Sequence, residues 1–364
     1  MKLKKYFCVI LIVVLFLSAC QSMPVNTSPD SELPDLSFYR QQDRGEFFIE
    51  TADYYYYLYN KMIYVSAKDN PAFYFLCSKP DCPHGGKDCN AYGGCAIGYW
   101  NGHLYSALLE GETPSVVQMD LDGSNHKEVA EIVLPLDANG SEGGSYTFYF
   151  HNGGIFYDVR NTSDFLFYLD LKTDETKPLL KGVLGTSDWL SSDLRFSGEK
   201  LILSIQGKNG IDTLYTCDIP SGEANKVENF SSFRWIGSVE GDMLYYYDKD
   251  RAAFCEYNLT AKEEKIALQL DYSGGAAYYD SEYIYLRTWD DEDSGKKGLS
   301  IFDRNYQFIQ RIELQGNLDF RYDAQDKLIF TDLPSQKATK YLPKSAIGTG
   351  EAEFLPMEDP YSYR

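Results

Sequence analysis

The fold is decided by NGHLYSALL, residues 101–109, in which a tight-turn pair leads directly into an apolar strand. Asn-Gly is a strong hairpin signal because both residues tolerate the positive φ that a two-residue turn requires. The same order of turn and strand occurs seven times: NKMIY at 60, NGHLY at 101, NGGIF at 152, GEKLI at 198, GDMLY at 241, SEYIY at 281 and QDKLI at 325. These starts lie 40 to 51 residues apart, which is the length of one four-stranded propeller blade, so they predict seven blades.

A second pattern ends an apolar strand with Asp or Asn and continues into a turn. It occurs five times, at Asp120, Asp170, Asp218, Asn258 and Asp303. Asx side chains can hydrogen-bond the backbone two residues further on, so we expect them in the hairpin between the third and fourth strands of each blade. A ring of carboxylates with a binding role is the alternative, but repetition from blade to blade favours a role in folding.

The body of the chain is predicted to be all-β. It consists of short strands rich in Tyr, Phe, Ile, Val and Leu, with no long segment of helical periodicity. Packing twisted sheets face to face around an axis buries a continuous core. Residues 47–49 and 353–355 are candidate strands at the two ends, one of which should complete a blade. We predict a single seven-bladed β-propeller domain over residues 41–364.

The first 20 residues have the layout of a secretory signal. A basic start precedes the apolar run 6–17, which is shorter than the roughly 20 residues that a membrane-spanning helix needs. LSAC at 17–20 resembles the bacterial lipobox, in which diacylglycerol is joined to the cysteine sulfur and a dedicated signal peptidase cuts before that cysteine. We predict a lipoprotein signal peptide over 1–19 and a lipid-modified Cys20. Ordinary secretion with a chance cysteine after the cleavage site is the alternative.

Residues 20–40 are predicted to be the lipidated cysteine and a flexible tether, because residues 21–37 contain three prolines, four serines and no apolar periodicity. This places the protein on the outer face of the bacterial cell membrane. Lys and Arg number 34 against 54 Asp and Glu, a formal net charge of −20. Loss of the three lysines before Cys20 would leave −23, so nucleic acid is excluded as a partner.

The loop at 77–95 concentrates residues that crosslink or bind metal, namely Cys77, Cys82, His84, Cys89 and Cys95. It falls where the first blade should have its outermost strand. Two disulfides would suit an oxidising exterior. Alternatively, the first four residues form a Cys₃His set for tetrahedral zinc, although one residue between two ligands is tighter than the usual spacing. Free thiols are the third alternative, and all three give the loop a structural role.

The same loop carries a family resemblance, in the segments LC at 76–77, DCPH at 81–84 and CNAY at 89–92. They resemble a motif near the start of many uncharacterised propeller lipoproteins of Gram-positive bacteria, and the DLDG turn at 120–123 is more loosely similar to Tol-type periplasmic propellers. The resemblance covers the lipobox, the loop and most of residues 46–357. It implies an exported, membrane-anchored propeller of unassigned activity. The family motif has three cysteines and the histidine, so Cys95 departs from it.

The remaining residues give no catalytic signature. No GxSxG elbow, HExxH helix, P-loop or GxGxxG fingerprint occurs. His103, His126 and His151 fall at predicted turns, whereas Cys217 and Cys255 are expected to be buried core thiols in the third strands of consecutive blades.

We therefore expect a monomeric binding or interaction module for an extracellular protein or glycan, with no cofactor other than zinc at the loop. The alternative is a hydrolase or lyase acting on polysaccharide, with carboxylates from different blades at the central funnel.

Overall fold

The computed structural model describes residues 47–110, 113–134, 146–159, 166–181, 183, 189–190, 194–206, 212–231, 234–272, 274–288, 297–333, 335, 337–350 and 353–357. The predicted signal peptide (1–19), the lipidation site Cys20 and the tether (20–40) lie outside the described residues. They therefore remain predictions.

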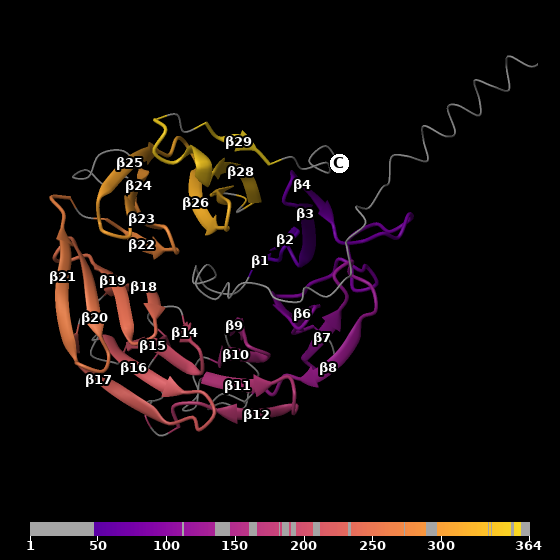
Figure 1. Ribbon diagram of the computed structural model, residues 1–364. Helices are drawn as coiled ribbons and strands as arrows, with labels where there is room; N and C mark the ends of the chain where they lie inside the picture. Colours follow the sequence, from indigo (N-terminus) through magenta and orange to yellow (C-terminus); the bar gives the residue numbers. More distant parts are fainter. Residues whose placement is uncertain are drawn as a thin grey trace, which may run out of the picture.

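Seven antiparallel sheets surround a common centre (Figure 1), which confirms the predicted all-β seven-bladed propeller. We number the blades 1 to 7 in chain order. Within each blade the strands follow one another from the centre outward, so every blade is built from one continuous segment.

The strands of the first four blades have the following bounds. Blade 1 contains β1 (Phe48–Glu50), β2 (Tyr54–Tyr59), β3 (Met62–Ala67) and β4 (Asn70–Phe75). Blade 2 contains β5 (Ala96–Trp100), β6 (His103–Leu108), β7 (Ser115–Met119) and β8 (Lys127–Glu131). Blade 3 contains β9 (Tyr146–His151), β10 (Gly154–Val159), β11 (Leu166–Asp170) and β12 (Glu175–Pro178). Blade 4 contains β13 (Trp189–Leu190), β14 (Arg195–Ser197), β15 (Lys200–Gln206), β16 (Asp212–Asp218) and β17 (Ala224–Ser231).

The last three blades are regular four-stranded sheets. Blade 5 contains β18 (Arg234–Glu240), β19 (Met243–Asp248), β20 (Ala253–Asn258) and β21 (Glu263–Gln269). Blade 6 contains β22 (Ala276–Tyr279), β23 (Tyr283–Thr288), β24 (Gly298–Asp303) and β25 (Phe308–Glu313). Blade 7 contains β26 (Leu318–Asp323), β27 (Lys327–Asp332), β28 (Lys337–Pro343) and β29 (Leu355–Pro356).

Five of the seven predicted turns join the first and second strands of blades 2, 3, 5, 6 and 7. In blade 4 the turn at Gly198 joins β14 to β15, and both β13 and β14 pair with β15. The seventh, at Asn60, also leads into an apolar strand, but it lies between β2 and β3, the second and third strands of blade 1. Asn60 and Lys61 have φ values of 48° and 64°, close to the 49° of Asn101 and the 79° of Gly102. The two turns therefore have the same local conformation, although they join different pairs of strands.

The five Asx residues enter the hairpin before the outermost strand of their blades, as predicted: Asp120 follows β7 directly, and the other four are the last residues of β11, β16, β20 and β24. Oδ1 of Asp170, Asn258 and Asp303 accepts the backbone N–H two residues further on, at 2.8, 3.0 and 2.9 Å. Oδ1 of Asp218 accepts the N–H of Ser221 at 2.8 Å. These bonds confirm the role in folding, since each satisfies a backbone group that the turn would otherwise leave without a partner.

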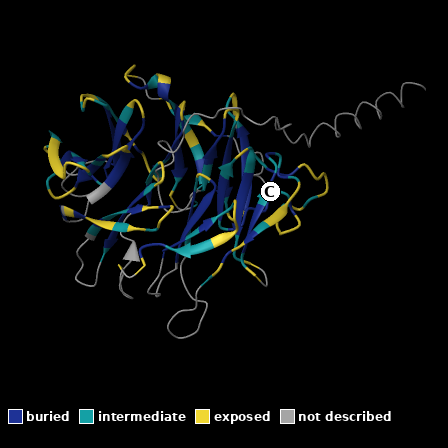
Figure 2. Ribbon diagram, turned by 60° about the horizontal axis from the view of Figure 1, so that its bottom comes forward, coloured by how far each residue is buried: buried dark blue, intermediate teal, exposed yellow. Residues whose placement is uncertain are grey.

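Hydrophobic clusters fill the wedges between neighbouring blades. Figure 2 shows that the strands of the ring consist largely of buried residues, whereas exposed residues gather at turns and outer strands. The inner strands are largely buried, whereas outer strands such as β8 and β21 expose most of their residues. Large aromatic side chains dominate the core: Tyr55, Tyr56, Tyr157, Tyr246, Tyr247, Tyr257, Tyr285, Phe148, Phe156, Phe254, Phe320 and Phe330 are all essentially inaccessible.

Blade 7 closes onto blade 1 through side chains, because both ends of the chain complete their own blades. The two predicted end segments contribute β1 and β29. Phe48 stacks on Tyr322 with 4.9 Å between ring centroids, and Glu50 accepts the backbone N–H of Gln325 at 2.9 Å. Figure 1 shows the indigo first blade beside the yellow last blade.

A single helical element occurs in the described part of the chain, the 3₁₀ turn η1 (Lys344–Ala346). Among these residues, no helix has the length and apolar content needed to cross a membrane.

Candidate functional site

The cysteine-rich loop follows β4 and leads into β5, so it links blade 1 to blade 2. The loop was expected at the position of the outermost strand of blade 1, as an insertion or a replacement. Because β4 already occupies that position, the loop is an insertion that follows the strand. The end of the loop nevertheless extends the same edge: Ile63 donates its backbone N–H to Ala91 at 2.6 Å, and Tyr92 forms an isolated antiparallel bridge with Met62.

The loop brings four of its five predicted site residues together. The ligand atoms of Cys77, Cys82, His84 and Cys89 all lie within 4.8 Å of one another. Cys77 and Cys89 are buried, whereas the other two are half-buried. We call these four residues the Cys₃His cluster.

Cys95 is separate from the cluster. It immediately precedes β5, and both its backbone N–H and its Sγ contact the carbonyl oxygen of Ala107 in blade 2, each at 3.0 Å. Burial raises the pKa of this thiol to about 12. All six cysteines in the described part of the chain, the buried Cys217 and Cys255 included, are free thiols.

His84 points its ring at the cluster because of its backbone conformation. Its φ of 50° lies in the left-handed region, which is uncommon for a residue other than glycine. The ring stacks on Phe75 at 4.6 Å, and Nδ1 lies 3.6 Å from Sγ of Cys89. This turn explains how Cys82 and His84, one residue apart, can face the same centre.

The cluster thiols differ in acidity. Burial acts to raise the pKa of Cys82, but hydrogen bonds from the His84 backbone and from the thiols of Cys89 and Cys77 lower it overall. Burial raises the pKa of Cys89 to about 12; hydrogen bonds with the thiols of Cys82 and Cys77 act in the same direction, and the backbone N–H of Ala91 opposes them. The three sulfurs and the imidazole nitrogen are close enough to bind one cation together.

Blade 2 holds the loop in place from its far side. The turn between β7 and β8 packs against it so closely that a Cβ on Gly123 would lie 2.6 Å from the carbonyl oxygen of Leu76. Gly123 also has a φ of 76°, which favours glycine. Nε2 of His126 lies 3.1 Å from the carbonyl oxygen of Asn90. The loop is therefore a fixed part of the junction between blades 1 and 2.

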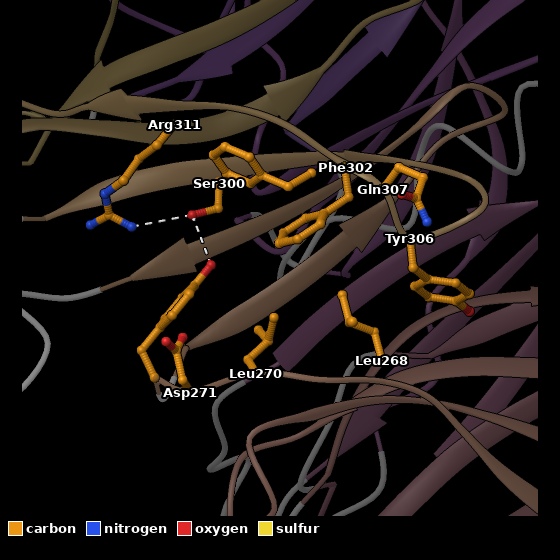
Figure 3. Close-up of a pocket in the computed structure, with 10 residues that line it drawn as sticks. Leu268, Leu270, Asp271, Ser300, Phe302, Tyr306, Gln307 and Arg311 are labelled. Atoms are coloured by element: carbon orange, nitrogen blue, oxygen red, sulfur yellow. Dashed lines mark hydrogen bonds between the residues drawn. The ribbon is translucent and has the colours of Figure 1, made fainter.

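A second site lies on the rim of the ring between blades 5 and 6. It is an open groove of about 700 Å³. We call it the rim groove, and it is lined by Leu268, Leu270, Asp271, Tyr272, Ser300, Phe302, Tyr306, Gln307, Phe308 and Arg311. Figure 3 shows the leucines across from Phe302, with Arg311 and Ser300 at one end. Nothing in the sequence analysis pointed to this groove.

The two ends of the rim groove differ in polarity. At one end, Oγ of Ser300 accepts hydrogen bonds from Tyr272 Oη at 3.1 Å and from Arg311 Nη1 at 3.2 Å (Figure 3). At the other end, Oη of Tyr306 donates to Glu256 at 2.9 Å. The hydroxyl groups of both tyrosines therefore bond within the protein, and their rings form part of an apolar wall.

Four of the buried carboxylates in the described part of the chain have cationic partners. Lys344 Nζ lies 2.6 Å from Asp280 and 2.5 Å from Asp323, Arg287 pairs with Asp319, and Lys68 lies 2.7 Å from Glu50. All four of these carboxylate residues are at least 96% inaccessible, so the pair Asp280 and Asp323 has no open face for a sugar chain. We call Lys344, Asp280 and Asp323 the lysine clamp.

The three histidines outside the loop do not form a catalytic set. His103 Nδ1 lies 3.4 Å from Asp120, and His151 Nε2 lies 2.9 Å from the carbonyl oxygen of Gly198 in blade 4. His126 contacts the carbonyl oxygen of Asn90. The three histidines therefore contact three different segments of the chain.

Comparison with known proteins supports the fold and leaves the activity open. No protein-family model and no curated protein sequence matches the chain, so the resemblance to Gram-positive propeller lipoproteins remains a prediction. A puromycin hydrolase structure matches 94% of this chain with a TM-score of 0.55 and 9% identity. A prolyl endopeptidase structure matches 89% with a TM-score of 0.54 and 13% identity. Dipeptidyl peptidase 4 of Porphyromonas gingivalis matches 90% with a TM-score of 0.48 and 11% identity.

The present chain spans 57%, 49% and 56% of those three chains, about half of their length. At such identities the likeness shows the propeller fold alone.

Proposed function

We propose that this protein is a binding propeller, held by a lipid on Cys20 to the outer face of a bacterial cell membrane, which binds a protein partner at the rim groove. The observation that carries the proposal is the groove itself, an open concavity between blades 5 and 6 whose walls are largely leucine, phenylalanine and tyrosine side chains. Ligand sites are concave and mostly apolar, with a few polar groups that fix orientation.

The exposed aromatic surface favours a partner. Phe308 is 59% exposed at the groove, and Ile266 on β21, the strand that carries Leu268, is 46% exposed. Large apolar side chains exposed close together on a soluble domain mark interaction sites, because their burial against a partner removes apolar surface from water.

The chemistry of the walls favours a protein segment over a glycan. Leucine and phenylalanine side chains match an apolar anchor residue, whereas a sugar ring needs free hydrogen-bonding groups around an aromatic face. Tyr272 and Tyr306 direct their hydroxyl groups to Ser300 and Glu256. Arg311 and Asp271 at the groove could pair with charges that flank the anchor.

The experiment is a binding screen of the purified body, residues 41–364, against peptide and glycan arrays, repeated with Phe308→Ser. Loss of an aromatic anchor should weaken binding about tenfold or more. Leu333→Ser is the matched control, because Leu333 is 40% exposed on blade 7, away from the groove. Binding that both variants lose equally, or neither loses, would contradict the groove assignment, and depolymerisation of a glycan would favour the hydrolase or lyase alternative.

The anchor has a separate test. Cys20→Ala should leave the precursor uncleaved or release the protein into the medium, because the lipid is joined to that sulfur. An unchanged membrane fraction with normal processing would contradict the anchor and leave the groove proposal standing.

A further inference from the structure

We propose that the Cys₃His cluster binds one zinc ion, which fixes the loop between blades 1 and 2. The donor set is the first reason. Donors around tetrahedral zinc lie roughly 3.3 to 3.8 Å apart, given Zn–S and Zn–N distances of about 2.3 and 2.0 Å. The four ligand atoms already lie within 4.8 Å of one another, so small side-chain rotations bring them onto a common ion.

The number of thiols is the second reason. Two disulfides in this loop require four cysteines, and the structure directs Cys95 away, to the carbonyl oxygen of Ala107. One disulfide within the cluster would use only two of its three cysteines. It would give no role to the third thiol or to the ring of His84, although all four side chains lie together. Three thiols and one imidazole make a complete structural zinc set.

The backbone around the cluster is the third reason. His84 holds a φ of 50°, a conformation that costs free energy for a residue with a Cβ and that persists where the surroundings require it. The backbone N–H of Ala91 points at Sγ of Cys89, 3.4 Å away. A hydrogen bond of this kind stabilises a thiolate, the form in which cysteine binds a metal.

A route for the ion is also present. An open cleft of about 670 Å³ reaches Cys82 and Cys89 from solvent, between the segment at Lys79 and the one at Asp88. With four protein ligands the site has no open position, so the ion has a structural role and not a catalytic one. The bound ion would hold the cysteine-rich loop against the turn that contains Gly123, and so help to set how blade 1 packs on blade 2.

The test is the zinc content of the full chain, purified without chelator from the cells that export it. We expect about one zinc per chain, and removal by a strong chelator should lower the unfolding midpoint by about 5 °C or more, with recovery when zinc is restored. Cys82→Ser and His84→Gln should lose most of the bound zinc. Cys95→Ser is the matched control and should retain it.

Cobalt replacement gives a second readout that does not depend on the stability of a variant. Co²⁺ in the wild-type protein should show thiolate charge-transfer and tetrahedral ligand-field bands, and Cys95→Ser should show the same spectrum. The proposal is overturned if the purified protein contains no zinc and two of the cluster cysteines are joined by a disulfide. Such a bond would make the mass about two daltons lower than that of the fully reduced chain. It is equally overturned if Cys95→Ser loses zinc to the same extent as Cys82→Ser. Neither result would bear on the rim groove.

Discussion

Replacing Lys344 with Met should destabilise the propeller more than any exposed lysine replacement, because the lysine clamp ties blade 6 to blade 7. Nζ lies 2.6 Å from Asp280 and 2.5 Å from Asp323, and the side chain of Lys344 is only 8% exposed. Removing one partner of a buried ion pair typically costs about 3–5 kcal/mol, since it leaves a buried charge uncompensated. Domains unfold with about 5–15 kcal/mol, so a loss of this size would be a large fraction of the total.

The clamp also predicts how this cost depends on pH. Burial raises the pKa of Asp323 well above its usual range, and the charge of Asp280 adds to the effect, although Lys344 opposes it. A carboxyl whose pKa is higher in the folded state destabilises the protein progressively as pH rises from the unfolded value toward the folded one. Without Lys344 the folded pKa rises further, so the variant should lose more stability at pH 8 than at pH 5.

Urea unfolding followed by tryptophan fluorescence measures the change. Lys200→Met is the control, because Lys200 and Asp242 form an ion pair of the same 2.6 Å length whose side chains are 41% and 46% exposed. Such a surface pair contributes no more than about 1 kcal/mol. The reasoning is refuted if Lys344→Met costs no more than Lys200→Met, or if its cost is the same at pH 5 and pH 8.

Two further predictions concern the core. Burial raises the pKa of Tyr157 to about 12 and those of Tyr279 and Tyr285 well above 10. The stability that these protonated phenols contribute is complete below pH 10 and is lost as pH rises above that value. Absorbance at 295 nm should therefore show that exposed tyrosines ionise first and that the buried ones ionise only when the protein unfolds cooperatively. A single smooth titration of all tyrosines with normal pKa values would contradict this. Gly98→Ala should destabilise by about 1–3 kcal/mol, because the new Cβ would overlap the ring of Phe150 in blade 3. Gly86→Ala, where the Cβ meets open space, should change stability by less than about 0.5 kcal/mol, and equal effects would refute the packing argument.

The number of blades could be predicted from local chemistry, because every blade contains a short polar or glycine-containing turn that leads directly into an apolar strand. That chemistry does not specify which hairpin a turn closes: the turn at Asn60 joins β2 to β3, whereas the turn at Asn101 joins β5 to β6. The first and second strands of blade 1 are joined by residues 51–53, TAD, which lack the Asn-Gly signal. The Asx turns were predictable because their hydrogen bonds span only two or three residues.

The sites were predictable to different degrees. Four residues of the loop come together because they lie within 13 positions of one another, whereas Cys95 departs because its backbone already belongs to the ladder of blade 2. The rim groove could not be predicted from sequence. Its walls come from residues 268–272 of blade 5 and 300–311 of blade 6. Whether a groove forms between them depends on how the two blades are placed relative to each other, and no local sequence pattern predicts that.

The central claim, that the rim groove is where this protein binds a protein partner, is tested most directly by site-specific photocrosslinking in the cells that produce it. A photoreactive amino acid at position 308 should give one discrete crosslinked species, which excess purified wild-type protein suppresses and excess Phe308→Ser protein does not. The same probe at position 333, exposed on blade 7, should give none. Equal crosslinking from both positions, or a product at 308 that both competitors suppress equally, would contradict the claim.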